Sequence, residues 1–228
     1  MVDLIAGLDA GRVRENLTRI EEEIAVAATR RPPAPGGVER RPVEVLAATK
    51  YVSLEDLPLL AQGGVRLVGE NRAQDLEAKV RAHGGLFEWD FIGQLQSRRV
   101  RQVVPLVRMI HSVASESAMR ELGRHRERAR PGLRIMIEVD LAGEATKAGV
   151  EPEELDAMIA RSPFPVAGLM TMPPLSEEPE DSRRWFSALR RLADERGLAE
   201  LSMGTSQDYR VAVEEGATVV RIGTRLYR

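Results

Sequence analysis

Cysteine is absent from this 228-residue chain. Its absence excludes disulfide bonds, thiolate zinc sites, iron–sulfur clusters and cysteine nucleophiles. Histidine occurs only three times, without metal-ligand spacing or an H-E-x-x-H motif, so we predict no metal site. Acidic and basic residues nearly balance, at 35 against 33, and aromatic residues make up only 4%. We therefore expect no nucleic-acid partner.

Long apolar stretches are also missing. Nowhere do about 18 uncharged apolar residues follow one another, so we predict no transmembrane helix and no membrane partner. The first residues lack the basic segment and apolar stretch of a secretory signal. We therefore expect a cytoplasmic protein. Hydrophobic residues make up 43% of the chain and charged residues 30%, which is typical of a globular protein.

The chain begins with a helical pattern and a loop. Over residues 11–30, apolar side chains recur every three or four positions, which predicts an amphipathic helix. Prolines and glycines at 32–37 cannot continue it, so we expect an exposed loop there. We assign residues 1–41 to this N-terminal helix and Pro/Gly loop.

From residue 42 onward, short apolar runs alternate with helical stretches. Runs without strict alternation of polar and apolar residues indicate strands of a parallel sheet that is buried on both faces. The runs are 43–49, 65–69, 88–93, 106–112, 133–140, 164–170, 199–204 and 218–223.

Eight strand–helix units are the number that a (β/α)8 barrel requires. We therefore predict an α/β fold, with a single TIM-like barrel over residues 42–228 and the additional N-terminal helix. An open doubly wound sheet is the competing architecture. No G-x-G-x-x-G motif follows the first run, which counts against its dinucleotide-binding form.

Reactive groups of such a barrel gather where the strands end. Lys50 follows the first run, in the sequence AATK. We expect a packed barrel mouth to desolvate this lysine partly and to lower its pKa from about 10.4. More neutral amine could then attack a carbonyl and form a Schiff base. The alternative is a solvent-facing lysine without a chemical role.

The last two strand ends carry small and hydroxyl residues. In the segment SMGTS, Ser206 lies where we expect a helix to begin. In the segment RIGT, Gly223 has no side chain and would let a ligand approach the backbone closely, and the hydroxyl of Thr224 lies next to it. Exposed amides and helix N-termini bind phosphate, and barrels often place that site after strands seven and eight. Each segment alone is ordinary turn chemistry. Together they favour a phosphate site.

A Schiff-base lysine that faces a phosphate cradle suggests pyridoxal 5′-phosphate (PLP), whose aldehyde and phosphate lie on different sides of one ring. Arg221 would then point at the ring nitrogen. Arginine cannot accept a proton, so it would keep this nitrogen unprotonated and weaken the ring as an electron sink. The alternative for Arg221 is a salt-bridged arginine at the barrel rim.

Several segments together carry a family resemblance. They are LAATK (46–50), LVGENRAQDLEAK (67–79), WDFIGQLQS (89–97), VDLAGEATKAGV (139–150), GLMTMPP (168–174) and LSMGTSQDYRVAVEEGATVVRIGT (201–224). In this combination the chain resembles the pyridoxal-phosphate homeostasis protein family, which is similar to the N-terminal barrel domain of alanine racemases.

The resemblance implies a role for particular residues. Lys50 matches the Schiff-base lysine, Asn71 a residue near the polar edge of the ring, and Arg221 the partner of the pyridine nitrogen. Ser206, Gly223 and Thr224 match the phosphate binders. The resemblance also implies PLP as the cofactor, a monomer, and a protein that buffers or delivers PLP, with PLP-dependent apoenzymes as partners and no catalytic residue.

Two other functions use the same residues. One is an active PLP-dependent amino acid racemase or lyase, with Tyr51 or Tyr209 as the acid. The other is a PLP-independent aldolase that acts on a sugar phosphate through Lys50. We favour the carrier because racemization requires proton donors on both faces of the substrate carbon. In alanine racemases one donor comes from a second domain, which we do not expect here.

Overall fold

The computed structural model of the chain describes residues 4–5, 7–33, 41–143 and 148–228. The predicted Pro/Gly loop falls largely on residues 34–40, and Lys147 of the VDLAGEATKAGV segment falls on 144–147. Both therefore lie outside the described residues. No helix of the described ranges is long and apolar enough to cross a bilayer.

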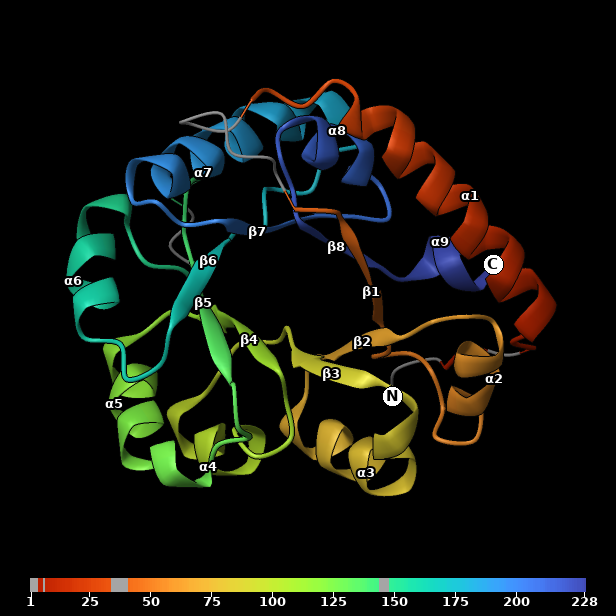
Figure 1. The fold of residues 1–228 in the computed structure, drawn as a ribbon, viewed down its shortest axis with the longest axis horizontal. Coiled ribbons are helices and arrows are strands. Elements are labelled where there is room, and N and C mark those ends of the chain that lie inside the picture. Colours follow the sequence, from red (N-terminus) through yellow and green to blue (C-terminus); the bar gives the residue numbers. More distant parts are fainter. Residues whose placement is uncertain (1–3, 6, 34–40, 144–147) are drawn as a thin grey trace.

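Eight strands form a closed barrel in sequence order, from β1 round to β8, and β8 pairs again with β1 (Figure 1). Neighbouring strands are parallel throughout. The strands are β1 (Glu44–Ala48), β2 (Leu67–Glu70), β3 (Glu88–Phe91), β4 (Met109–Val113), β5 (Arg134–Glu138), β6 (Val166–Met170), β7 (Glu200–Thr205) and β8 (Val219–Ile222). Every predicted run overlaps one strand, and β2, β4 and β7 each extend one residue beyond their runs. The barrel prediction is therefore confirmed, and the open sheet is wrong.

A helix follows each strand and covers the outside of the barrel (Figure 1). The helices are α2 (Leu57–Gln62), α3 (Ala73–His83), α4 (Val100–Val103), α5 (Glu116–Arg124), α6 (Leu155–Ala160), α7 (Arg183–Glu195), α8 (Tyr209–Glu214) and α9 (Thr224–Tyr227). Short 3-10 helices lie at Gly84–Leu86, Ser97–Arg99, Arg126–Arg128, Pro152–Glu154 and Pro179–Ser182.

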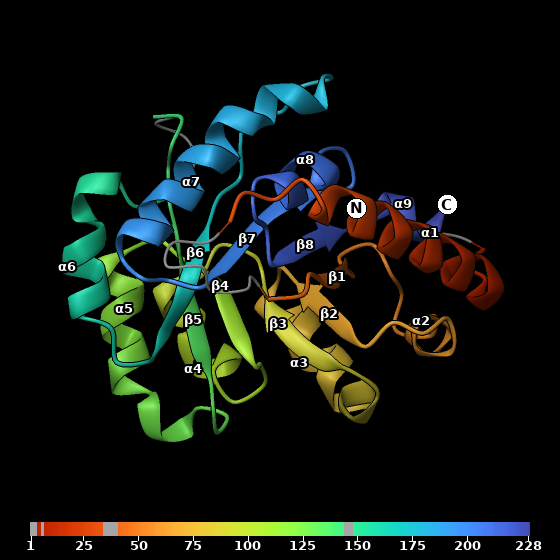
Figure 2. The same cartoon turned by 45° about the horizontal axis from the view of Figure 1, so that its top comes forward.

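The predicted N-terminal helix is α1 (Ala10–Ala28). It begins where the Asp9 side chain accepts a hydrogen bond from the backbone N–H of Arg12, which satisfies one of the free donors of the first turn. Its buried face includes Val13, Ile20 and Ile24. The helix packs against α2, α8 and α9, so it lies on the outer wall of the barrel beside its last strands (Figure 2).

The barrel interior holds a small apolar cluster, separate from the larger core between strands and helices. Its buried members are Leu46, Leu67, Met109, Met136, Met170 and Val219. Successive side chains of a strand point to opposite faces, so residues two positions away share the inward direction. Several of these inward positions carry buried polar side chains, namely Asp90, His111, Glu138, Ser202 and Arg221.

Candidate ligand-binding site

Strand topology brings the predicted site residues to one end of the barrel. They follow or end β1, β2, β7 and β8, and the carboxyl ends of parallel strands lie at the same edge. The register pairs Leu46 with Arg221 and Ala48 with Gly69, so β1 lies between β2 and β8. Lys50 therefore extends from β1 between Asn71 on one side and the Gly223–Thr224 segment on the other.

Lys50 is exposed, so the expectation that packing desolvates it is wrong. Its Nζ lies 4.6 Å from the centroid of the Tyr51 ring, a distance at which the ring face attracts an ammonium group. Below it, the Tyr227 hydroxyl donates to the backbone oxygen of Ala48 at 2.9 Å and ties the end of β1 to α9. The amine is thus accessible at a strand end that is itself fixed.

A buried ion pair joins the ends of β1 and β2. The Nζ of Lys79 lies 2.6 Å from Glu70 Oε2 and donates to the backbone oxygen of Thr49 at 2.7 Å. Glu70 also accepts from the backbone N–H of Asn71 through Oε1 at 2.8 Å. These contacts hold the residue before Lys50 and the backbone of Asn71.

Sequence reasoning missed this pair. The signal was present, because Lys79 continues the spacing of Ala73 and Leu76 on the buried face of α3.

Asn71 contributes a buried acceptor. Its side-chain Oδ1 has no hydrogen-bond partner among the described residues, although the atom is inaccessible to solvent. Buried polar atoms of native proteins are almost always paired, so an orphan at a barrel mouth fits a ligand that brings a donor.

Ser206 turns toward β8. Its hydroxyl accepts the backbone N–H of Gly223 at 3.0 Å, which links the ends of β7 and β8. The prediction that a helix begins at Ser206 is wrong, because α8 begins at Tyr209. The residues between form a turn in which the Asp208 side chain accepts from the N–H and hydroxyl of Thr205, at 2.7 and 3.0 Å.

The space around this link is open, and one of the arginines that line it, Arg225, is paired with Glu23 at 2.6 Å. A Cβ at Gly223 would have only the Ala48 Cβ within 4.0 Å. Ser206 and Thr224 line one cavity of about 460 Å³. Three arginines line the same cavity, namely Arg19, Arg225 and Arg228. Hydroxyls, an exposed backbone and guanidinium groups together suit a phosphate.

Arg221 lies inside the barrel and is only 5% exposed. Its Nη1 donates to the backbone oxygen and hydroxyl of Ser202, at 2.8 and 2.6 Å. Its Nη2 donates to the Thr171 backbone oxygen and Met172 Sδ. All of these acceptors are neutral, so the alternative of a salt-bridged rim arginine is wrong. Burial lowers the pKa of Arg221 to about 10, which still leaves it charged at neutral pH.

Tyr209, the other tyrosine considered as an acid, lies elsewhere. It is 1% exposed, and its hydroxyl donates to Glu23 of α1 at 2.6 Å. Burial and the neighbouring carboxylate raise its pKa well above the ordinary value. Tyr209 therefore fastens α1 to α8 and does not serve as an acid at the barrel mouth.

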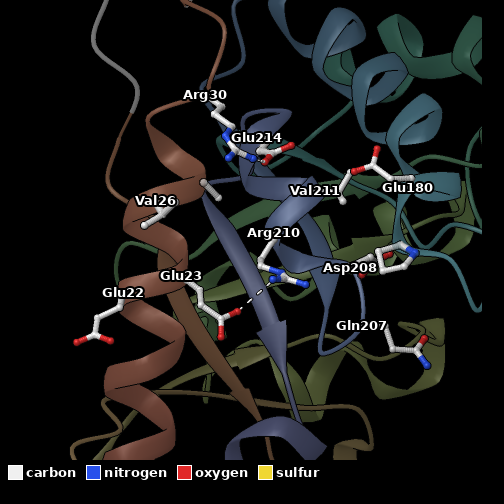
Figure 3. Close-up of a pocket in the computed structure, with 12 residues that line it drawn as sticks. Glu22, Glu23, Val26, Arg30, Glu180, Gln207, Asp208, Arg210, Val211 and Glu214 are labelled. Carbon is white, nitrogen blue, oxygen red and sulfur yellow. Dashed lines mark hydrogen bonds and ion pairs between the residues drawn. The ribbon is translucent and has the colours of Figure 1, made fainter.

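A larger cavity, of about 540 Å³, lies between α1 and α8 (Figure 3). None of the predicted site residues lines it. Its two lining arginines are paired with carboxylates, Arg30 with Glu214 at 2.9 Å and Arg210 with Glu23 at 3.8 Å. We interpret it as a salt-bridged seam between two helices.

Glu138 adds a titratable carboxyl near Arg221. It ends β5 and is 9% exposed. Burial raises its pKa from 4.5 to about 7, although Arg221 acts in the opposite direction. The folded protein therefore binds this proton more tightly than the unfolded chain does. Between pH of about 4.5 and 7, stability consequently falls as the pH rises, and it is fully present only below that window.

We expect Glu138→Gln to remove this dependence. At pH 8 the variant should be more stable than the parent by roughly 3 kcal/mol, since each pKa unit corresponds to about 1.4 kcal/mol. At pH 4 the two should differ little. Urea unfolding at both pH values measures the difference, and Glu177→Gln, at an exposed position, is the control. An equal effect at pH 4 and pH 8 would contradict the assignment.

Together, the fold and the arrangement of these residues define a class of protein. This is the parallel barrel with a lysine after its first strand and hydroxyl residues at the ends of its last two. The family model of the alanine racemase N-terminal domain matches residues 44–228. Solved alanine racemases share the fold, and that of Corynebacterium glutamicum has a TM-score of 0.65 at 16% identity, covering 96% of this chain and 61% of its own.

The more similar relatives define the family further. The pyridoxal phosphate homeostasis protein of Aquifex aeolicus is 38% identical over 93% of this chain and 96% of its own, and that of Escherichia coli is 30% identical over 94% and 95%. PipY of Synechococcus elongatus, solved with PLP bound, has a TM-score of 0.73 at 30% identity, covering 92% of this chain and all of its own. The chain belongs to the pyridoxal phosphate homeostasis protein family.

Proposed function

We propose that this chain is a single PLP-binding barrel domain, with its cofactor attached to Lys50 through a Schiff base, and that it buffers or carries PLP within the cell. The observation that carries the proposal is the hydrogen bond between the Gly223 N–H and the Ser206 hydroxyl. It links the ends of β7 and β8, which supports a phosphate cradle there, directly beside the strand that precedes Lys50.

Each residue has a distinct part in holding the cofactor. Ser206, Gly223 and Thr224 hold the phosphate, and the exposed Lys50 bonds to the aldehyde. The unpartnered Oδ1 of Asn71 offers an acceptor to the polar edge of the ring. When bound, PLP supplies a reactive aldehyde and a ring that can delocalise negative charge.

Arg221 supports a carrier rather than an enzyme. Its guanidinium is held by neutral acceptors and stays protonated at neutral pH. A permanent donor beside the ring nitrogen keeps that nitrogen unprotonated, which weakens the ring as an electron sink. The names of the homeostasis relatives and the PLP-bound PipY support the same function. Delivery to apoenzymes, the monomeric state and the cytoplasmic location stay predictions.

Titration of the purified protein with PLP tests this function. We expect a saturable visible absorption band, characteristic of PLP bound to an amine, with one equivalent bound. A panel of L-amino acids incubated with the loaded protein separates the carrier from a racemase or lyase, because the carrier should yield no D-isomer and no cleavage product. A protein that remains colourless in excess PLP would refute the proposal, and an empty aldolase would behave in this way.

The cradle makes its own prediction. Thr224→Ala should weaken PLP binding by about 1–2 kcal/mol, the scale of one hydrogen bond to a charged group. Thr224→Ser keeps the hydroxyl and should bind nearly as the parent does. Dissociation constants from absorption titrations provide the comparison. If the alanine variant binds PLP as tightly as the serine variant does, the Thr224 hydroxyl takes no part in the cradle.

A further inference from the structure

A chain of buried polar side chains crosses the inside of the barrel and ends at Arg221. His111 on β4 is fully buried, and its Nδ1 lies 2.8 Å from the hydroxyl of Ser202 on β7. Its Nε2 lies 3.1 Å from Oδ2 of Asp90 on β3. Asp90 in turn accepts from Arg108, through Nε at 3.1 Å and Nη2 at 2.9 Å. The imidazole thus bridges strands that are not neighbours in the sheet.

Hydrogen-bond inventory fixes the direction of this chain. The ionised Asp90 carboxylate only accepts hydrogen bonds, so the His111 Nε2 that faces it carries a hydrogen. In a neutral ring, Nδ1 then keeps its lone pair. Arginine only donates, so the Ser202 hydroxyl oxygen accepts from Arg221 Nη1 at 2.6 Å and gives its own hydrogen to His111 Nδ1.

Asp90 is suited to hold the proton on Nε2 in place. It is completely buried, and hydrogen bonds from His111 and Arg108 outweigh its burial and lower the pKa of its carboxyl. The carboxylate is thus a fixed acceptor for Nε2–H. Along the path from Arg108 to Arg221 every donor faces an acceptor, and only the Ser202 hydroxyl has both roles, because it accepts from Arg221 and donates to His111.

We infer that His111 is a positioning residue for Arg221, which it holds toward the bound cofactor through the Ser202 hydroxyl. The inference rests on the proposed function in one respect, namely that Arg221 contacts the ring nitrogen. Without the acceptor at Nδ1, the Ser202 hydroxyl would turn its hydrogen elsewhere. Arg221 would then lose an oriented partner on its Nη1 side.

The first arm of the test does not depend on PLP. Nitrogen-15 NMR of the protein without cofactor at pH 7 should show a single neutral tautomer for His111, with the proton on Nε2. The His111→Asn variant assigns the resonance, since His83 and His125 remain. Ser202→Ala should shift the Nδ1 resonance, which loses its donor, and leave the proton on Nε2, because Asp90 still holds it. An imidazolium, or a proton on Nδ1, in the parent protein would overturn the inference.

The second arm measures the consequence for binding. Pyridoxine 5′-phosphate carries the ring nitrogen and phosphate but no aldehyde, and inorganic phosphate reports on the cradle alone. We expect His111→Leu and Ser202→Ala to weaken binding of pyridoxine 5′-phosphate roughly tenfold, which corresponds to about 1.4 kcal/mol, and to leave phosphate binding unchanged. His111→Asn, which keeps an acceptor near Nδ1, should restore most of the affinity.

Two results separate this inference from the proposed function. If the parent protein binds no pyridoxine 5′-phosphate and no PLP, the proposed function fails, while the NMR arm still decides the hydrogen-bond chain. If the parent binds both and the folded His111→Leu and Ser202→Ala variants bind pyridoxine 5′-phosphate equally well, the positioning role of His111 is refuted. Urea unfolding confirms that each variant is folded. Ser202→Ala removes only one hydroxyl, so it disturbs the barrel interior less than His111→Leu does.

Discussion

Replacing Lys50 by alanine should abolish the visible absorption of the PLP-loaded protein completely. The chain has only three lysines, Lys50, Lys79 and Lys147. Lys79 is unsuited to attack an aldehyde, because its Nζ is buried and bonded to Glu70 and the Thr49 backbone. Lys50 is exposed beside the cradle, so the coloured species depends on it.

The same variant should keep part of its binding. Ser206, Gly223 and Thr224 remain, so inorganic phosphate and pyridoxine 5′-phosphate should bind as they do to the parent. Absorption spectra and competition titrations measure the two effects separately. Lys147→Ala is the matched control and should stay coloured. A coloured Lys50→Ala protein, or a colourless Lys147→Ala protein, would assign the Schiff base to another amine.

Replacing Lys79 by methionine should have the largest effect on stability. The side chains of Lys79 and Glu70 are only 7% and 0% exposed. Removing one partner of a buried ion pair leaves an uncompensated charge, which costs about 3–5 kcal/mol of the free energy of unfolding. Urea unfolding at pH 7 measures the loss.

Two further variants make this prediction specific. Arg81→Met lies on the same helix and removes an exposed pair with Glu77, so it should change stability by less than about 0.5 kcal/mol. The double variant Glu70→Leu/Lys79→Met removes both charges and should recover part of the loss, although Thr49 Oγ and the Asn71 N–H then lose an acceptor. Equal effects of Lys79→Met and Arg81→Met would show that the buried pair is not strongly coupled.

The barrel could be predicted because its signals are local. Each strand is a short apolar run, each helix has its own periodicity, and eight units in alternation leave few architectures. The ends of β1, β7 and β8 could likewise be named, since the fold places all carboxyl ends at one edge. Lys50, Ser206 and Thr224 lie at or just after the ends of these strands, and their joint role in holding one cofactor stays a prediction.

The missed features depend on which strands lie opposite one another. His111 and Ser202 are 91 residues apart, and no local pattern shows that their side chains meet across the barrel. The sequence did hold one indication of buried polar contacts, namely a polar residue at an inward position of an apolar strand. Asp90, His111 and Glu138 are such residues. The late start of α8 was missed because it follows from a turn in which the Asp208 side chain accepts from Thr205. Lys50 lies in another turn, which the hydrogen bond from the Val52 N–H to the Thr49 backbone oxygen closes.

Borohydride reduction of the PLP-loaded protein, followed by peptide mass spectrometry, most directly tests whether Lys50 and the β7–β8 cradle share one cofactor. Reduction makes the bond to the amine permanent, and the three lysines fall in well-separated segments of the sequence. We predict that the label lies on Lys50 alone, and that it disappears when inorganic phosphate in excess occupies the cradle during loading. A label on Lys147, or one on Lys50 that phosphate does not displace, would contradict a site shared by the first and last strands.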